Sequence, residues 1–219
     1  MASDVAPKAP PVFDEGFRDR LRDLLVWRRD VRRFRTDPLP SDTALRLIES
    51  ARLAPSVGLS EPWRFATVSD PERCRAVREN FRTANENALA GYSGEKAQLY
   101  ATLKLSGMDQ APLQIAVFTD ETSEQGSGLG RATMPETFAY SAVAAIHAMW
   151  LTARAEGIGI GWVSILNPAE IPAILDTPSD WRFIAYLCIG YPEIDSSSPA
   201  LEEAGWERRR PTMDFVIER

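Results

Sequence analysis

The sequence is poor in the residues that hold metal ions and disulfides. It contains two cysteines and one histidine among 219 residues, which is too few for a disulfide framework or for a zinc site with its usual ligand spacing. No stretch approaches the roughly 18 apolar residues that a membrane-spanning helix needs. We therefore interpret Cys74 and Cys188 as reduced packing residues of a cytoplasmic protein that has no membrane partner.

An excess of positive charge is absent as well. The net charge is −6 at neutral pH, whereas a nucleic-acid-binding domain is more often basic. This balance argues against a nucleic-acid partner. A local cluster of arginines in such an acidic protein instead favours a small anionic ligand.

Several catalytic motifs are also missing. The sequence has no Walker A motif and no G-x-S-x-G nucleophile elbow. The glycines of GIGIG (157–161) lie inside an apolar, strand-like run, where they indicate close backbone packing rather than a dinucleotide-binding turn. The single histidine, His147, lies within an apolar helical pattern and is interpreted as a core or interface residue, so Ser–His–acid catalysis is poorly supported.

Apolar periodicity and turn signals predict an α+β fold with a central mixed or antiparallel sheet flanked by helices. Residues 1–14 are interpreted as a flexible leader, followed by a single domain at 15–219. The segment 135–155 is apolar nearly all round, which predicts a long buried helix at a subunit interface. We predict helices at 15–27, 41–54, 71–108 (with a break near 91–94), 135–155 and after Asn167-Pro168, and strands at 64–69, 112–119, 158–166 and 182–190.

Arginines gather in two places. Residues 28–35 hold five of them around one acid, Asp30, and residues 208–210 hold three more. Guanidinium groups suit phosphate because each donates two hydrogen bonds in one plane, although a solvated charged turn fits the pattern equally well. The loop SVGLSEPWRF (56–65) offers backbone amides near Ser56 and an aromatic wall at Trp63, which suits a flat heteroaromatic ligand.

Three stretches in this order, RRDVRRF, APSVGLSEPWRF and ARAEGIGIGWVSI, resemble the FMN-dependent nitroreductase superfamily. The resemblance covers about residues 15–215. It implies a nitroreductase-like fold, bound FMN, and a homodimer whose interface contains the long apolar helix.

Within that superfamily the chain is more similar to the branch of the 5,6-dimethylbenzimidazole synthases. RRDVR carries Asp30 where other members tend to have a hydroxyl residue, and SGEKAQLYATLKLSGM and GWERRRP fit the same branch. The resemblance implies oxygen-dependent fragmentation of reduced FMN to 5,6-dimethylbenzimidazole, the lower ligand of vitamin B12, and erythrose 4-phosphate. Reduced FMN and O2 are then substrates, and NAD(P)H acts only indirectly, through a separate flavin reductase.

The resemblance also implies roles for single residues. Asp30 and Ser164 match the two catalytic positions, Asp30 as the acid/base group and Ser164 as a proton guide or a hydrogen-bond donor to the opening ring. We expect Asp30 to stay ionised, since nearby positive charge favours a carboxylate. The 93–108 segment is expected to form a lid over the ring. The implied flavin-binding residues are Arg28, Arg29, Asp30, Val31, Arg32, Ser56, Pro62, Trp63, Leu105, Gly161, Ser164 and Arg209, with Arg208 or Arg210 as alternatives to Arg209.

Two other functions fit the same fold. An NAD(P)H-dependent nitroreductase or flavin reductase would cycle FMN instead of destroying it, and a reductase of the corrinoid cob(II)yrinic acid a,c-diamide belongs with this alternative. The second is a flavin-binding protein without turnover. The presence of both Asp30 and Ser164 argues against the latter.

Overall fold

The computed structural model describes residues 10–219, so most of the predicted leader, residues 1–9, lies outside the described residues. The first helix, α1 (Glu15–Trp27), has the predicted bounds, and Asp14 caps it by accepting a hydrogen bond from the amide of Phe17 at 2.7 Å. Among residues 10–219, no helix combines the length and the apolar character that a membrane crossing needs.

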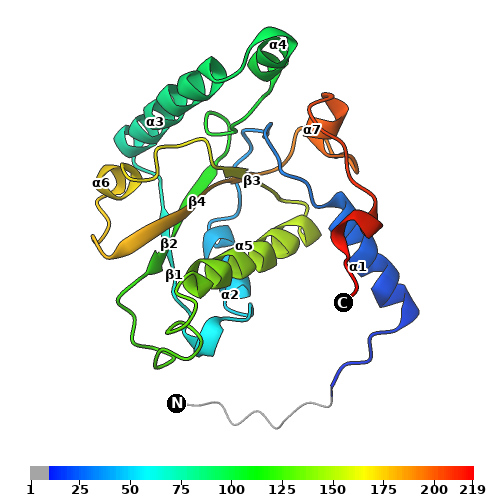
Figure 1. The fold of residues 1–219 in the computed structure, drawn as a ribbon, viewed down its shortest axis with the longest axis vertical. Helices are drawn as coiled ribbons and strands as arrows, with labels where there is room; N and C mark the ends of the chain where they lie inside the picture. Colours follow the sequence, from blue (N-terminus) through cyan, green and yellow to red (C-terminus); the bar gives the residue numbers. More distant parts are fainter. Residues whose placement is uncertain (1–9) are drawn as a thin grey trace.

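A four-stranded sheet forms the centre of the molecule (Figure 1). Its strands are β1 (Trp63–Thr67), β2 (Leu113–Asp120), β3 (Gly159–Val163) and β4 (Trp181–Gly190). They are ordered β1-β2-β4-β3, and every neighbouring pair is antiparallel. The predicted α+β fold is therefore confirmed, with the antiparallel form of the sheet.

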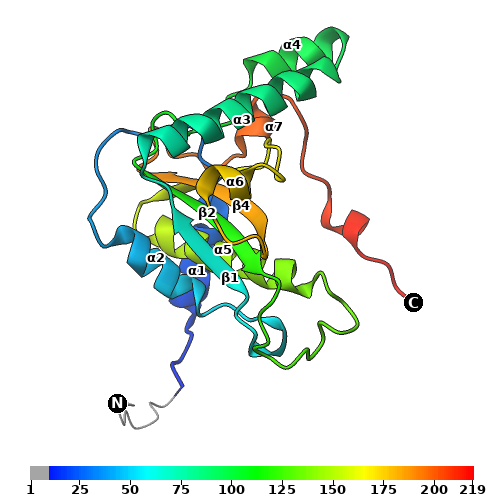
Figure 2. The same ribbon diagram turned by 90° about the vertical axis from the view of Figure 1, so that its left-hand side faces the viewer.

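Helices cover both faces of this sheet (Figures 1 and 2). On one face, α2 (Thr43–Ala51) and α5 (Thr137–Ala155) pack against Ile115 and Val117 of β2. On the other, α3 (Pro71–Ala90) and α6 (Ile171–Leu175) pack against Ala116 and Phe118. The alternation follows from the two-residue period of a strand. It explains why β2 reads as a continuous apolar run.

The two cysteines are free and belong to the packing of the second face, as predicted. Cys188 on β4 is fully buried and Cys74 on α3 is half-buried against the same cluster. Burial raises the pKa of both thiols, to about 12 for Cys188. Both thiols are therefore protonated at neutral pH and poor nucleophiles.

The polar helical stretch after residue 70 divides into α3 and α4 (Gly94–Thr102). Asp70 caps α3 as predicted, accepting from the amides of Glu72 and Arg73 at 3.0 and 2.8 Å. The expected continuation of the helix to residue 108 is wrong. The chain leaves α4 to pass tightly over Phe34, where a Cβ at Gly107 would lie 2.3 Å from the ring.

The long helix α5 is buried on one side only. Its outer side exposes Tyr140, Val143 and His147, so burial nearly all round and a core position for His147 were wrong for the single chain. The proposed role of this helix in a subunit interface stays a prediction. Gly157 ends the helix in the left-handed region (φ +74), as its position after the last apolar residue predicted.

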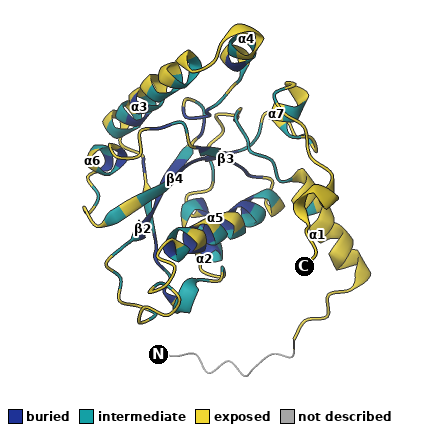
Figure 3. Cartoon of the chain, in the orientation of Figure 1, coloured by how far each residue is buried: buried dark blue, intermediate teal, exposed yellow. Residues whose placement is uncertain are grey.

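The C-terminal part contains two short helices that the polar sequence did not predict, α7 (Ala200–Glu203) and the 3-10 turn η2 (Thr212–Phe215). The final residues run away from the body of the molecule (Figure 2) and expose Met213, Phe215, Val216 and Ile217. Helix α1 has no buried residue either and is coloured almost entirely as exposed in Figure 3.

Residues 30 and 31 run alongside the outer edge of β3. The amide of Val31 donates to the carbonyl of Ile160 at 3.0 Å, and Asp30 forms an isolated parallel bridge with Ile160. A Cβ at Gly161 would lie 2.0 Å from the carbonyl oxygen of Val31, and a Cβ at Gly159 would lie 2.6 Å from its side chain. These glycines therefore serve close backbone approach, as the sequence indicated.

Replacing Gly161 with alanine should destabilise the protein by about 3 kcal/mol, because the new methyl group would push residues 30–31 off β3. Chemical denaturation measures this loss. Gly16→Ala on the exposed helix α1 is the matched control and should leave the stability unchanged or raise it by up to about 1 kcal/mol. A loss at Gly161 below about 0.5 kcal/mol would contradict the tight contact.

Candidate active site

Asp30 is fixed to the sheet through its side chain. Its Oδ1 accepts a hydrogen bond from the backbone amide of Trp162 at 2.9 Å, at the outer edge of β3. An edge strand leaves such amides without a neighbouring strand, and here a carboxylate occupies the acceptor position. Trp162 lies two residues before Ser164, and two residues of extended chain span about 7 Å. The hydrogen bond to Trp162 therefore holds the Asp30 carboxylate close to Ser164 along the chain.

The electrostatics of Asp30 differ from the sequence-based expectation. Its carboxylate pairs with the guanidinium of Arg32, which lowers its pKa, as the hydrogen bond from Trp162 also does. Burial is nevertheless the largest influence, and the net result is a pKa raised above the usual range. About 39% of the side chain is accessible, but the backbone of 30–31 and β3 displaces water from around the carboxyl group. Asp30 therefore holds a proton more readily than its neighbouring arginines alone would allow.

Arg32 joins Asp30 to the 93–108 segment. Its Nη1 donates to the carbonyl oxygen of Leu105 at 2.5 Å, while its Nη2 holds the Asp30 carboxylate. The two ends of this contact are 73 residues apart in the sequence. The structure therefore brings together Asp30, Val31, Arg32, Leu105 and Gly161 from the predicted site.

Three further arginines form a region of concentrated positive charge. The charges of Arg28 and Arg209, together with burial as the largest cause, lower the pKa of Arg29. Nε of Arg29 is buried and has no hydrogen-bond partner among the described residues, and none of the three makes an ion pair with a carboxylate in residues 10–219. The guanidinium of Arg28 lies over the ring of Trp150, 4.9 Å from the ring centroid. This arrangement fits a phosphate group.

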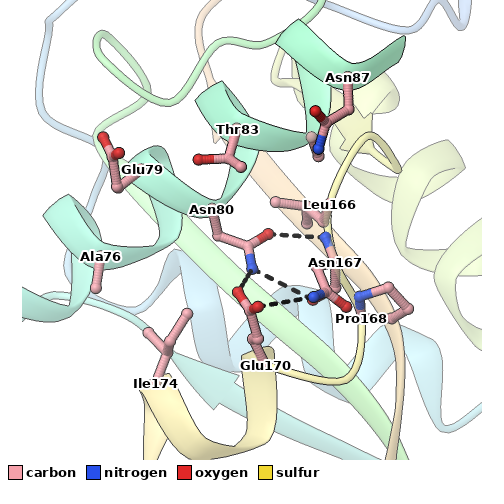
Figure 4. Close-up of a pocket in the computed structure, with 11 residues that line it drawn as sticks. Ala76, Glu79, Asn80, Thr83, Asn87, Leu166, Asn167, Pro168, Glu170 and Ile174 are labelled. Carbon is pink, nitrogen blue, oxygen red and sulfur yellow. Dashed lines mark hydrogen bonds between the residues drawn. The ribbon is translucent and has the colours of Figure 1, made fainter. Parts of the chain in front are cut away.

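Ser164 is exposed at the end of β3, and the chain that follows it is held by a network that the sequence did not reveal. Asn80 of α3 accepts from the amide of Asn167 at 2.9 Å and donates to the carbonyl of Asn167 at 3.3 Å and to Glu170 at 2.7 Å (Figure 4). Asn80 is buried. Nothing in a polar helical sequence distinguishes such an asparagine from its solvated neighbours.

A cavity of about 710 Å³ lies beside this network, between α3 and residues 166–174 (Figure 4). It contains none of the predicted site residues. Its polar groups at Asn80, Asn167 and Glu170 already satisfy one another. We therefore assign it to the packing of α3 rather than to the active site.

Ser56, Pro62 and Trp63 lie apart from the other predicted residues. The loop that contains Ser56 is tied to α5 through a hydrogen bond from the amide of Val57 to Ser141 (3.1 Å). Pro62 is buried, and Trp63 is only 7% exposed and belongs to the core at the start of β1. β1 and β3 form opposite edges of the sheet. A single chain thus places these three residues on the far side from Asp30.

Comparison with known proteins shows the family of this chain. The nitroreductase family model matches residues 25–191. The chain is 53% identical over 201 residues to a 5,6-dimethylbenzimidazole synthase of Rhodospirillum rubrum, covering 92% of this chain and 95% of that protein. It is 48% identical over 200 residues to a synthase of the same name from Rhodobacter capsulatus, covering 91% and 97%.

Solved structures share the fold at lower identity. A BluB-like flavoprotein from Clostridium difficile has a TM-score of 0.67 at 21% identity, covering 91% of this chain and 98% of that chain. An iodotyrosine deiodinase bound to FMN and 3-iodo-L-tyrosine has a TM-score of 0.70 at 22% identity, covering 91% and 97%. The sequence matches, the antiparallel α+β fold and the arginine-rich site together show that this chain belongs to the nitroreductase family and, within it, to the 5,6-dimethylbenzimidazole synthases.

Proposed function

We propose that this protein fragments reduced FMN with molecular oxygen to give 5,6-dimethylbenzimidazole and erythrose 4-phosphate. The observation that carries the proposal is the position of Asp30, an ionisable group with a raised pKa, bonded to β3 and to Arg32 beside a cluster of arginines that pair with no carboxylate in residues 10–219. Relatives with about half of their residues in common carry the name of this activity. Bound reduced flavin would supply the electrons and the carbon skeleton of the product.

The residues of this chain have separate tasks. Arg28, Arg29 and Arg209 bind the flavin phosphate, because Arg29 has an unused buried donor and the cluster has no carboxylate of its own among the described residues. Asp30 accepts a proton during ring and side-chain cleavage, and its raised pKa lets it return that proton. Ser164 holds or passes a proton at the end of β3.

A second copy of the chain completes the site. Within one chain, β1 and β3 are separated by three strand spacings, roughly 14 Å, and Trp63 and Gly161 also differ in level along the strands. Residues that border one flavin from both places therefore come from two subunits. The exposed apolar residues of α1, α5 and the C-terminal tail, such as Phe17, Val143 and Phe215, are suited to the interface of this homodimer.

The reaction needs a supply of reduced FMN. We propose that a separate flavin reductase provides it from NAD(P)H, and that the 93–108 segment closes over the flavin ring, with Leu105 packed on it, so that water stays out. The protein acts in the cytoplasm, a location that suits its two free cysteines.

Asp30→Asn should strongly slow product formation without preventing flavin oxidation. Purified protein receives photoreduced FMN and air, and the products are identified by mass. The variant should form 5,6-dimethylbenzimidazole at least about 100-fold more slowly because it lacks the proton acceptor, while the flavin still reoxidises. Asp37→Asn, an exposed acid paired with Arg35 in the same segment, is the matched control and should retain activity. Normal product yield from Asp30→Asn would overturn the assignment.

Arg209→Gln should weaken FMN binding by about 10- to 100-fold, since it removes a bidentate phosphate contact. Riboflavin, which has no phosphate, should bind both proteins equally. Arg208→Gln and Arg210→Gln should have smaller effects, because only Arg209 is close enough to influence Arg29. Titration by flavin fluorescence measures all three. Equal losses for FMN and riboflavin would contradict a phosphate contact.

The acid limb of the pH–rate profile should report Asp30. The proton acceptor is ionised only above its pKa, so the rate falls as the pH falls through that value, at a higher pH than for an ordinary aspartate. Arg32→Gln removes the charge that lowers this pKa, and the limb should move to higher pH. Arg33→Gln, an exposed neighbour that does not pair with Asp30, should leave it in place. An acid limb that stays at the same pH, or moves to lower pH, in Arg32→Gln would count against Asp30 as the base.

A further inference from the structure

Trp206 connects the C-terminal segment to the 93–108 segment. Its ring meets Tyr92 edge-on at a centroid distance of 5.4 Å and Tyr100 at 5.9 Å, and Nζ of Lys96 lies 4.1 Å from its centroid. Tyr100 is nearly buried by these contacts and bonds Asn85 of α3 at 2.8 Å. Helix α4 and the turn before it are therefore held by a residue from the far end of the chain.

The backbone around Trp206 fixes the direction of the chain that follows. Gly205 takes the left-handed region (φ +75) after α7, and the amide of Trp206 donates to the carbonyl of Leu201 at 2.9 Å. Arg209 follows three residues later, and its charge lowers the pKa of Arg29. One short segment thus touches both α4 and the arginine cluster.

The other end of the 93–108 segment is held in a similar way. Arg32 bonds the carbonyl of Leu105 and belongs to the same arginine-rich turn as Arg28 and Arg29. Both supports of this segment, Trp206 and Arg32, therefore lie within four residues of an arginine that we assign to the flavin phosphate. This inference rests on the proposed function.

We propose that Trp206 is a positioning residue that transmits phosphate binding at Arg209 to the 93–108 segment. Phosphate holds residues 206–209 in place, Trp206 then holds Tyr92, Tyr100 and Lys96, and α4 stays closed over the ring. The enzyme thereby selects flavin 5′-phosphates at the chemical step as well as in binding. Binding energy from a remote group of the substrate commonly acts in this manner.

An open segment favours a competing reaction. Reduced flavin and oxygen then give oxidised flavin and hydrogen peroxide, and no carbon bond breaks. The fraction of flavin that becomes 5,6-dimethylbenzimidazole, which we call the coupling yield, therefore measures closure separately from flavin affinity.

The experiment compares coupling yields in a single turnover, with enzyme in excess over photoreduced flavin. In the wild type, reduced riboflavin should give a coupling yield roughly 10-fold lower than reduced FMN, even when fully bound. Trp206→Leu should lower the yield with FMN by a similar factor, about 10-fold, while FMN affinity changes much less. Trp206→Phe, which keeps an aromatic ring, should stay within about 2-fold of the wild type.

Trp181→Leu is the matched control. Trp181 packs on Phe118 at the start of β4 (centroids 5.8 Å apart), away from α4. This substitution removes the same side chain and should leave the coupling yield with FMN unchanged. Thermal unfolding of each variant confirms that the protein is folded at the assay temperature.

Supplying the phosphate separately tests the transmission itself. Phosphite dianion, added to wild-type enzyme with reduced riboflavin, should occupy the arginine cluster and raise the coupling yield. Trp206→Leu should not respond. An equal response in both proteins, or a normal yield from Trp206→Leu with FMN, would overturn the role of Trp206. A wild type that makes no 5,6-dimethylbenzimidazole from reduced FMN would overturn the proposed function instead, so the two failures are distinguishable.

Discussion

The contact between residues 30–32 and the edge of β3 supports the rest of the site. Because Gly161 has no side chain, the carbonyl of Val31 comes so close that a Cβ at residue 161 would lie 2.0 Å from its oxygen. The Asp30 carboxylate accepts a hydrogen bond from the amide of Trp162, which no neighbouring strand in residues 10–219 uses. An edge strand is thereby covered without a fifth strand. The same contact aims Arg32 at Leu105, so the position of the 93–108 segment follows from the position of Asp30.

Two opposing influences act on the pKa of Asp30. Its hydrogen bond to Trp162 and its pair with Arg32 stabilise the ionised form, whereas burial stabilises the protonated form and prevails. The pKa of this carboxyl group therefore depends on both its burial and its charged partner. Arg32 then limits how far the protonated form is favoured, which makes it a tuning residue as well as a link.

Local chemistry in the sequence predicted most of the framework. The Asp70-Pro71 helix start, Gly157 as a helix end and the apolar runs of β2 and β4 each depend on a few adjacent residues, and all were confirmed. The non-helical course of residues 103–108 was missed because its close contact, Gly107 against Phe34, joins residues more than seventy positions apart. The raised pKa of Asp30 was missed for a related reason: arginines can be counted in a sequence, but burial cannot. Asn80 gave no signal, since its partners Asn167 and Glu170 are distant in the chain.

The fold alone does not decide what happens to a flavin. Iodotyrosine deiodinase shares this architecture at 22% identity and carries a different activity in its name. The distinguishing features are therefore local ones. Here, the arginines that we propose bind the phosphate and the supports of the 93–108 segment belong to the same two stretches of chain, 28–32 and 206–209. If the arginines bind the phosphate and Trp206 holds the 93–108 segment closed, as we propose, this chain would fragment its flavin only when the ring is sealed from water, and not whenever reduced flavin meets oxygen.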